Sequence, residues 1–156
     1  MDMGQQVTKQ DLDEFARFAM EKMSFLQTEY GFSPQTAGSQ GLLAKAIYTH
    51  VDLAIEITLD WKDRAVDCMV VRMENGEFPV GYYVSPDGKT IRKHVAGVIR
   101  EFRCDVDQTV LAHLRKTAHL SYWKRTLDVL KSMVEDYRKI LISCMACILQ
   151  NKEKLF

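Results

Sequence analysis

The stretch DLAIEITLDW, residues 52–61, decides the fold because apolar and polar side chains alternate along it. Successive side chains of a β-strand point to opposite faces of a sheet, so this period of two predicts a strand with one buried and one polar face. The buried face is predicted to carry Leu53, Ile55, Ile57, Leu59 and Trp61. The polar face is predicted to carry Asp52, Glu56, Thr58 and Asp60.

Three neighbouring segments are predicted to complete the sheet. The alternating stretch is flanked along the chain by residues 42–48 (LLAKAIY) and 65–73 (AVDCMVVRM). The last segment is residues 78–84 (FPVGYYV), which follow Asn75-Gly76, a strong hairpin signal. Pro79 cannot donate a ladder hydrogen bond, which places the last of these strands at an edge or at a bulge. Because the connections are short, we expect an antiparallel meander of about four strands.

An amphipathic helix is predicted before the sheet, over residues 8–30. Thr8 is its expected N-cap, with Asp11 at the third helical position of a capping box, and Gly31 is its expected stop. The polar residues 33–41 (SPQTAGSQG) then contain a proline and two glycines. We interpret them as a connector rather than as a phosphate-binding loop, because no Lys-Ser/Thr ending is present.

The chain returns to helical spacing after the sheet. Residues 91–102 and 107–118 are predicted to be helices, the second with Asp107 as its N-cap, and residues 121–150 are predicted to be one long helix. Apolar residues in the long helix recur with spacings of four and three, the heptad seam of a helix that lies along another helix. The seam consists of Trp123, Leu127, Leu130, Val134, Tyr137, Leu141, Cys144 and Ile148.

The apolar run at residues 140–149 (ILISCMACIL) belongs to this long helix. It is too short for a membrane span, which needs about 20 apolar residues. Because it is apolar on nearly every face, we expect either the chain's other helices or a second copy to surround it, and we favour a homodimer contact.

Bulk composition indicates one domain over residues 1–156, of the α+β class. The 156 residues are 47% hydrophobic and 27% charged, an ordinary globular balance. With 21 basic and 21 acidic residues, the chain lacks the basic excess typical of nucleic-acid binders. Its start, MDMGQQVTKQ, does not resemble a secretory signal or a myristoylation site, so we expect a cytoplasmic protein without a membrane partner.

The four cysteines are predicted to be reduced packing residues. Cys68, Cys104, Cys144 and Cys147 do not resemble the disulfide framework of a small secreted domain. The pair at 144 and 147 lacks the second ligand pair of a zinc site, and it lies near a helix C-terminus rather than at the N-terminus where a redox pair is activated. No metal or cofactor is predicted.

A basic cluster beside two tyrosines is the candidate interaction patch. Exposed aromatic side chains next to charges are common at protein interfaces. The patch consists of Tyr82, Tyr83, Arg92, Lys93, His94 and Arg100. The alternative is that these residues form a solvated helix start.

A second candidate site surrounds Asp60, Asp63 and Arg64, where paired carboxylates could do acid/base chemistry in a hydrolase or could hold a small molecule. The alternative, which we favour, is a polar turn beside a buried Trp61. No catalytic residue is assigned, and an enzyme is less favoured than a binding module.

Three segments carry a resemblance to known proteins: FLQTEYGF (residues 25–32), VDLAIEITLDW (residues 51–61) and FPVGYYV (residues 78–84). Over residues 12–102 the order of parts resembles a group of uncharacterised small bacterial α+β proteins. Some proteins of this build are immunity or accessory factors near toxin systems. The resemblance implies a protein partner and transfers no catalytic residue. We therefore expect a non-catalytic interaction module of immunity or regulatory type. The other alternative is a purely structural dimer subunit.

Overall fold

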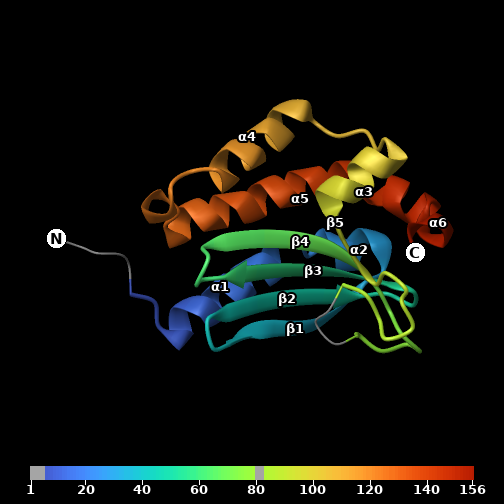
Figure 1. Ribbon diagram of the computed structural model, residues 1–156, viewed down its shortest axis with the longest axis horizontal. Coiled ribbons are helices and arrows are strands. Elements are labelled where there is room, and N and C mark those ends of the chain that lie inside the picture. The colour runs from blue at the N-terminus through green and yellow to red at the C-terminus, as the bar shows by residue number, and fades with distance from the viewer. Residues whose placement is uncertain (1–5, 80–82) are drawn as a thin grey trace.

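The sheet is an antiparallel meander in the order β1-β2-β3-β4-β5 (Figure 1). The computed structural model describes residues 6–79 and 83–156. The strands are β1 (Ser33–Gln40), β2 (Leu43–Thr49), β3 (Leu53–Asp60), β4 (Ala65–Arg72) and β5 (Arg92–His94). The predicted α+β class is confirmed, and the alternating stretch forms the central strand β3.

Helices precede and follow the sheet. They are α1 (Lys9–Lys22), α2 (Phe25–Tyr30), α3 (Val95–Phe102), α4 (Gln108–Ala118), α5 (Leu127–Gln150) and α6 (Lys152–Leu155), with the 3₁₀ turn η1 (Tyr122–Lys124) before α5. Thr8 and Asp11 form the predicted capping box, and Asp107 caps α4 as predicted. The helix predicted over residues 8–30 is interrupted at Met23, which caps α1, and Gly31 ends α2 in the left-handed conformation.

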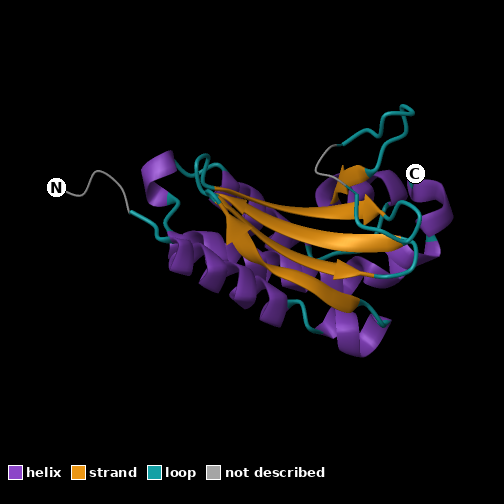
Figure 2. Ribbon diagram, turned by 90° about the horizontal axis from the view of Figure 1, so that it is seen from below, coloured by secondary structure: helices purple, strands orange, loops and turns teal. Residues whose placement is uncertain are grey.

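The main core lies between the sheet and the long helices. Phe15 of α1, Ile55 of β3 and Leu141 of α5 are all buried in this one cluster. The opposite, outer face of the sheet carries a smaller cluster of Ala54, Met69 and Val71. Figure 2 shows helices along one side of the sheet and the described parts of the segment between β4 and β5 on the other.

The polar residues 33–41, predicted as a connector, instead supply β1 at the edge of the sheet. An edge strand with mostly exposed side chains needs no apolar alternation, which is why the sequence pattern missed it. Side chains of α1 cover part of its outer edge. Asp13 Oδ1 accepts from Ser39 N at 2.9 Å and from Ser39 Oγ at 2.6 Å, and Lys9 Nζ donates to Ser39 O at 3.0 Å.

The prediction of a strand over residues 78–84 is wrong for residues 78–79 and 83–84, which the structure describes. Val84 makes only an isolated bridge with Thr90, and β5 takes the place beside β4. The hairpin turn after β4 does form, as a bridge between Glu74 and Glu77. Phe78 then packs against the apolar cluster on the outer face of the sheet, so burial redirects the chain away from β4. The helix predicted from residue 91 consequently begins only at Val95.

The predicted long helix exists from Leu127 to Gln150, 24 residues or about 36 Å. Its predicted start at residue 121 is wrong, because Thr126 is an extended N-cap. Trp123 therefore lies outside the helix and is 60% exposed. The remaining seam residues pack in or against the core, as expected for a helix lying along other elements.

The apolar end of α5 is covered largely by the chain itself. Leu141, Cys144 and Ile148 are fully buried, and α5 packs against α1, α3, α4 and β4. Ile142, which is 41% exposed, is the large apolar side chain of this run that faces outward. Within residues 6–79 and 83–156, no helix combines the length and the apolar character that crossing a bilayer requires.

Candidate anion-binding site

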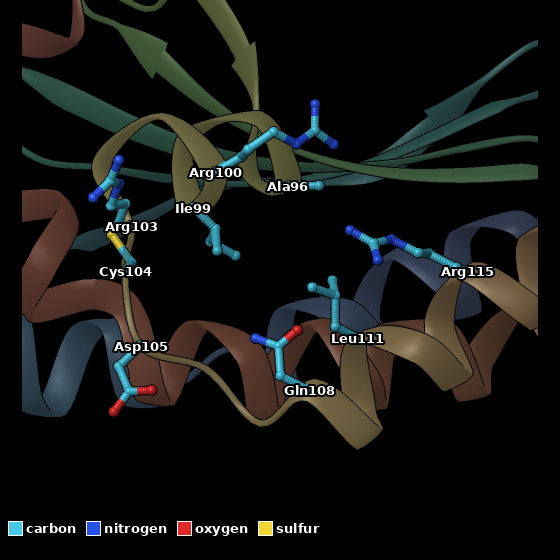
Figure 3. Close-up of a pocket in the computed structure, with 9 residues that line it drawn as sticks. All are labelled: Ala96, Ile99, Arg100, Arg103, Cys104, Asp105, Gln108, Leu111 and Arg115. Atoms are coloured by element: carbon cyan, nitrogen blue, oxygen red, sulfur yellow. The ribbon is translucent and has the colours of Figure 1, made fainter.

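A pocket of about 500 Å³ lies between α3 and α4 (Figure 3). Both helices pack on α5, and direct contacts between them are few among the described residues. The volume falls in the ordinary range of small-ligand pockets. The pocket is therefore the space left between α3 and α4, which both pack on α5.

One face of each helix lines the pocket. Residues three or four apart share a face of a helix, and both contributions follow that spacing. From α3 and its C-cap come Ala96, Ile99, Arg100 and Arg103. From α4 come Gln108, Leu111 and Arg115.

The rim of the pocket is positively charged. Arg100, Arg103 and Arg115 are all exposed, and none of them makes an ion pair with a described residue. Figure 3 shows Arg115 extending from α4 toward the space between the helices, Arg100 extending along α3 past Ala96, and Arg103 farther along, beside Cys104. Asp105 also lines the pocket, but its carboxylate points away from the cavity (Figure 3). Each guanidinium group offers several N–H donors in a planar fork that suits carboxylate and phosphate groups.

The floor of the pocket is apolar. Ile99 and Leu111 are both buried, and their side chains point into the space between the helices (Figure 3). The amide of Gln108 also points into it, from the start of α4 (Figure 3). The pocket thus offers two kinds of contact, guanidinium groups at the rim and aliphatic carbon below them.

A disulfide between Cys104 and Cys147 forms part of the pocket wall. It joins the linker after α3 to α5 across a sequence separation of 43. The prediction that these two cysteines are reduced packing residues is wrong. Their spacing along the chain gave no sign of the pairing, because only the packing of α3 on α5 brings them together.

The other two cysteines are buried thiols, as predicted. Burial raises the pKa of Cys144 to about 12 and the pKa of Cys68 well above its usual 9.0. A thiol reacts through its thiolate, so these two side chains are unreactive in the folded protein.

The structure places the described residues of the predicted interaction patch on more than one face. Alternation along β5 places Arg92 and His94 on the outer face of the sheet and Lys93 on the helix side, where it pairs with Glu101 at 3.2 Å. Arg100 lies on α3, at the pocket. Tyr82 is outside the described residues.

Arg92 has a structural environment. It is 4% exposed, and its Nε lies 3.2 Å from Oε1 of Glu56, which is equally buried. The guanidinium also lies 5.2 Å from the ring centroid of Phe78 and donates to Pro79 O at 3.2 Å. The arginine thereby fastens the loop after β4 to the outer face of the sheet.

His94 and Tyr83 lie beside this buried pair. Tyr83 Oη and His94 Nε2 are 3.3 Å apart, and His94 Nδ1 lies 3.7 Å from Asp67 Oδ1. Both side chains are exposed. Contact of Tyr83 and His94 with a protein partner stays a prediction.

The Asp60–Arg64 region forms a packed turn. Asp60 Oδ1 accepts from Lys62 N at 3.0 Å, while Asp63 is exposed. Arg64 is buried and stacks 4.4 Å from Trp61 and 4.5 Å from Tyr122. The pocket that Arg64 lines together with Asp67 and Arg125 includes neither Asp60 nor Asp63, and the acid/base alternative itself remains a prediction.

Comparisons with protein-family models, with curated proteins and with solved structures found no match. The function is therefore argued from the geometry of the site. Sequence reasoning named Arg100 but missed Arg103, Gln108 and Arg115. Their helix-face spacing was readable from the sequence, but the meeting of α3 and α4 on α5 was not.

Proposed function

We propose that this protein is a non-catalytic interaction module that holds an acidic segment of a protein partner in the pocket between α3 and α4. The observation that carries the proposal is the set of three arginines around the pocket, none of which is neutralised by a described residue. A guanidinium forms paired, charge-assisted hydrogen bonds with carboxylates, which suits a glutamate- or aspartate-rich segment.

The apolar floor narrows the class of segment. Carboxylates can meet Arg100 and Arg115 at the rim, while an aliphatic side chain between them contacts Ile99 and Leu111. Burying such a side chain contributes roughly 1.5–3 kcal/mol, and the low dielectric of the floor strengthens the charged contacts above it. The expected ligand is therefore a segment in which acidic residues flank an apolar one.

The residues around the pocket favour binding over chemistry. Its cysteine is bonded in a disulfide, and its carboxylate points outward (Figure 3). Nucleophilic or acid/base catalysis needs a nucleophile and a base within hydrogen-bond reach of each other. The described lining contains no such pair.

The immunity or regulatory type and the cytoplasmic location are part of this proposal. A disulfide in the cytoplasm is usually transient and redox-responsive, because thioredoxin and glutathione keep most thiols reduced there. The homodimer remains an untested prediction. Because α5 is largely covered by its own chain, the reason for expecting the dimer is weaker than the sequence suggested.

The proposal is tested by fluorescence anisotropy with a labelled peptide of glutamates around a central leucine. Arg115→Ala should weaken binding roughly tenfold or more, as expected for the loss of a charge-assisted contact. Arg115→Lys should retain part of the affinity, because the charge remains without the bidentate geometry. Arg17→Ala, an exposed arginine on α1, is the matched control and should leave binding unchanged. Equal binding by wild type and an Arg100→Ala/Arg115→Ala variant would refute the proposal, as would no binding by the wild type.

A further inference from the structure

We propose that the Cys104–Cys147 disulfide is a reversible modification site, reduced by dithiols of the thioredoxin class, and that its redox state sets the affinity of the pocket. The first part stands on the disulfide alone. The second part, which concerns affinity, rests on the proposed function.

The bond reaches the surface mainly through Cys147, which is half-buried on α5, while Cys104 is 6% exposed in the wall of the pocket. Cys68 and Cys144, in contrast, are at most 1% exposed. The two bonded cysteines are therefore the ones expected to respond to a reagent added to the folded protein.

The surroundings favour attack at Cys104. The attacking species is a thiolate, and the guanidinium groups of Arg100, Arg103 and Arg115 make its approach through the pocket electrostatically favourable. On the other side of the bond, the side-chain amide of Asn151 lies with its Nδ2 3.8 Å from Cys147 Sγ. A donor at that position stabilises negative charge on Cys147 as it leaves.

The exchange balances as a two-electron transfer. A thiolate of the reductant forms a bond to Cys104 Sγ, the Sγ–Sγ bond breaks, and the electron pair stays on Cys147, which takes a proton. The second thiol of the reductant then attacks the mixed disulfide and releases Cys104. The protein gains two thiols, and the reductant becomes a disulfide.

Reduction should alter the pocket because the linker of residues 103–107 connects its two walls. Cys104 ties this linker covalently to α5, and direct contacts between α3 and α4 are few. Without the bond, the linker keeps the hydrogen bond from Cys104 N to Ile99 O at 3.0 Å and the burial of Val106. The spacing of Arg100 and Arg115 is then less restricted, so ordering them around a ligand costs more entropy.

Binding and reduction are linked in both directions. If the disulfide state prefers the ligand, the ligand stabilises the disulfide by the same free energy. A segment seated in the pocket also covers Cys104, so it should slow the attack of a dithiol. The protein would release its partner under reducing conditions and retain it under oxidising ones.

The modification site is tested on the full chain by maleimide labelling and mass spectrometry, with dithiothreitol as the probe. The oxidised protein should remain unlabelled while folded. After brief reduction, Cys104 and Cys147 should be labelled, whereas Cys68 and Cys144 should require unfolding. Labelling of all four cysteines on reduction would show that the protein unfolds and would overturn the proposal, as would a disulfide that dithiothreitol reduces only in denaturant.

The coupling is tested with the same glutamate–leucine peptide. The reduced protein should bind it roughly fivefold or more weakly than the oxidised protein, a typical coupling between two sites. A Cys104→Ser/Cys147→Ser variant should bind like the reduced protein at every dithiothreitol concentration, and Cys144→Ala should respond like the wild type. Equal affinity in both redox states would overturn the coupling while the proposed function stands. Absence of peptide binding, with labelling as expected, would instead refute the proposed function and leave only the modification site.

Discussion

Removing the Cys104–Cys147 disulfide is expected to lower the free energy of unfolding by about 4 kcal/mol. The two cysteines are 43 residues apart, and closing a loop of that length in the unfolded chain costs about 13 cal/mol/K of entropy, or about 4 kcal/mol at 25 °C. The loop encloses α4, η1 and most of α5, so its closure restricts a large part of the unfolded chain. Small domains have a total stability of about 5–15 kcal/mol, so the loss would be large.

The assay is urea denaturation followed by far-ultraviolet circular dichroism. The Cys104→Ser/Cys147→Ser variant is compared with the oxidised wild type, and the same pair is measured again in dithiothreitol. The variant should be insensitive to the reductant, and the reduced wild type should approach the stability of the variant. A difference below about 1 kcal/mol between oxidised wild type and variant would refute the reasoning, because the chain-entropy model requires several times more.

Three other measurements follow from the structure. Arg92→Met should lower the free energy of unfolding, measured by urea denaturation, by about 3 kcal/mol or more, because Glu56 then stays buried without its closest cation. Lys93→Met breaks the more exposed neighbouring pair with Glu101 and should lower it by under about 1 kcal/mol. Equal losses in the two variants would contradict a structural role for the buried Arg92–Glu56 pair. Burial raises the pKa of Cys144 from 9.0 to about 12, so the unfolded state loses the thiol proton at a lower pH than the folded state does. The free energy of unfolding should therefore fall as the pH rises from 9 toward 12, by up to about 1.4 kcal/mol per pH unit. In Cys144→Ala the free energy of unfolding should decline less steeply with pH. A pH profile identical to that of the wild type would contradict the effect of the Cys144 thiol. Light scattering tests the predicted homodimer directly: twice the monomer mass of 18.0 kDa is expected of the dimer, and the monomer mass itself would refute it.

The sequence predicted those parts of the fold in which side-chain burial follows a period. The alternation around Ile55 and Ile57 identified β3, and the seam from Leu127 to Ile148 identified most of α5. Local hydrogen bonding likewise made the caps at Thr8 and Asp107 predictable. In each of these cases the interactions that form the element involve residues close together in the chain, so the local sequence pattern reveals them.

The failures occurred where distant segments decide the structure. β1 is an edge strand held by pairing with β2 and by contacts from α1, so its own side chains carry no apolar alternation. Phe78 packs onto the outer face of the sheet instead of extending a hairpin. The disulfide and the pocket both depend on how α3 and α4 pack on α5, which no spacing in the chain reports.

The central claim, that the pocket between α3 and α4 binds an acidic segment, is tested most directly by nuclear magnetic resonance. The ¹⁵N-labelled oxidised protein would be titrated with the glutamate–leucine peptide while backbone amides and arginine Nε–Hε groups are observed. We predict that the shift changes gather at residues 96–115 and include the side chains of Arg100 and Arg115. Changes concentrated instead around Tyr83 and His94, on the outer face of the sheet, would contradict the account.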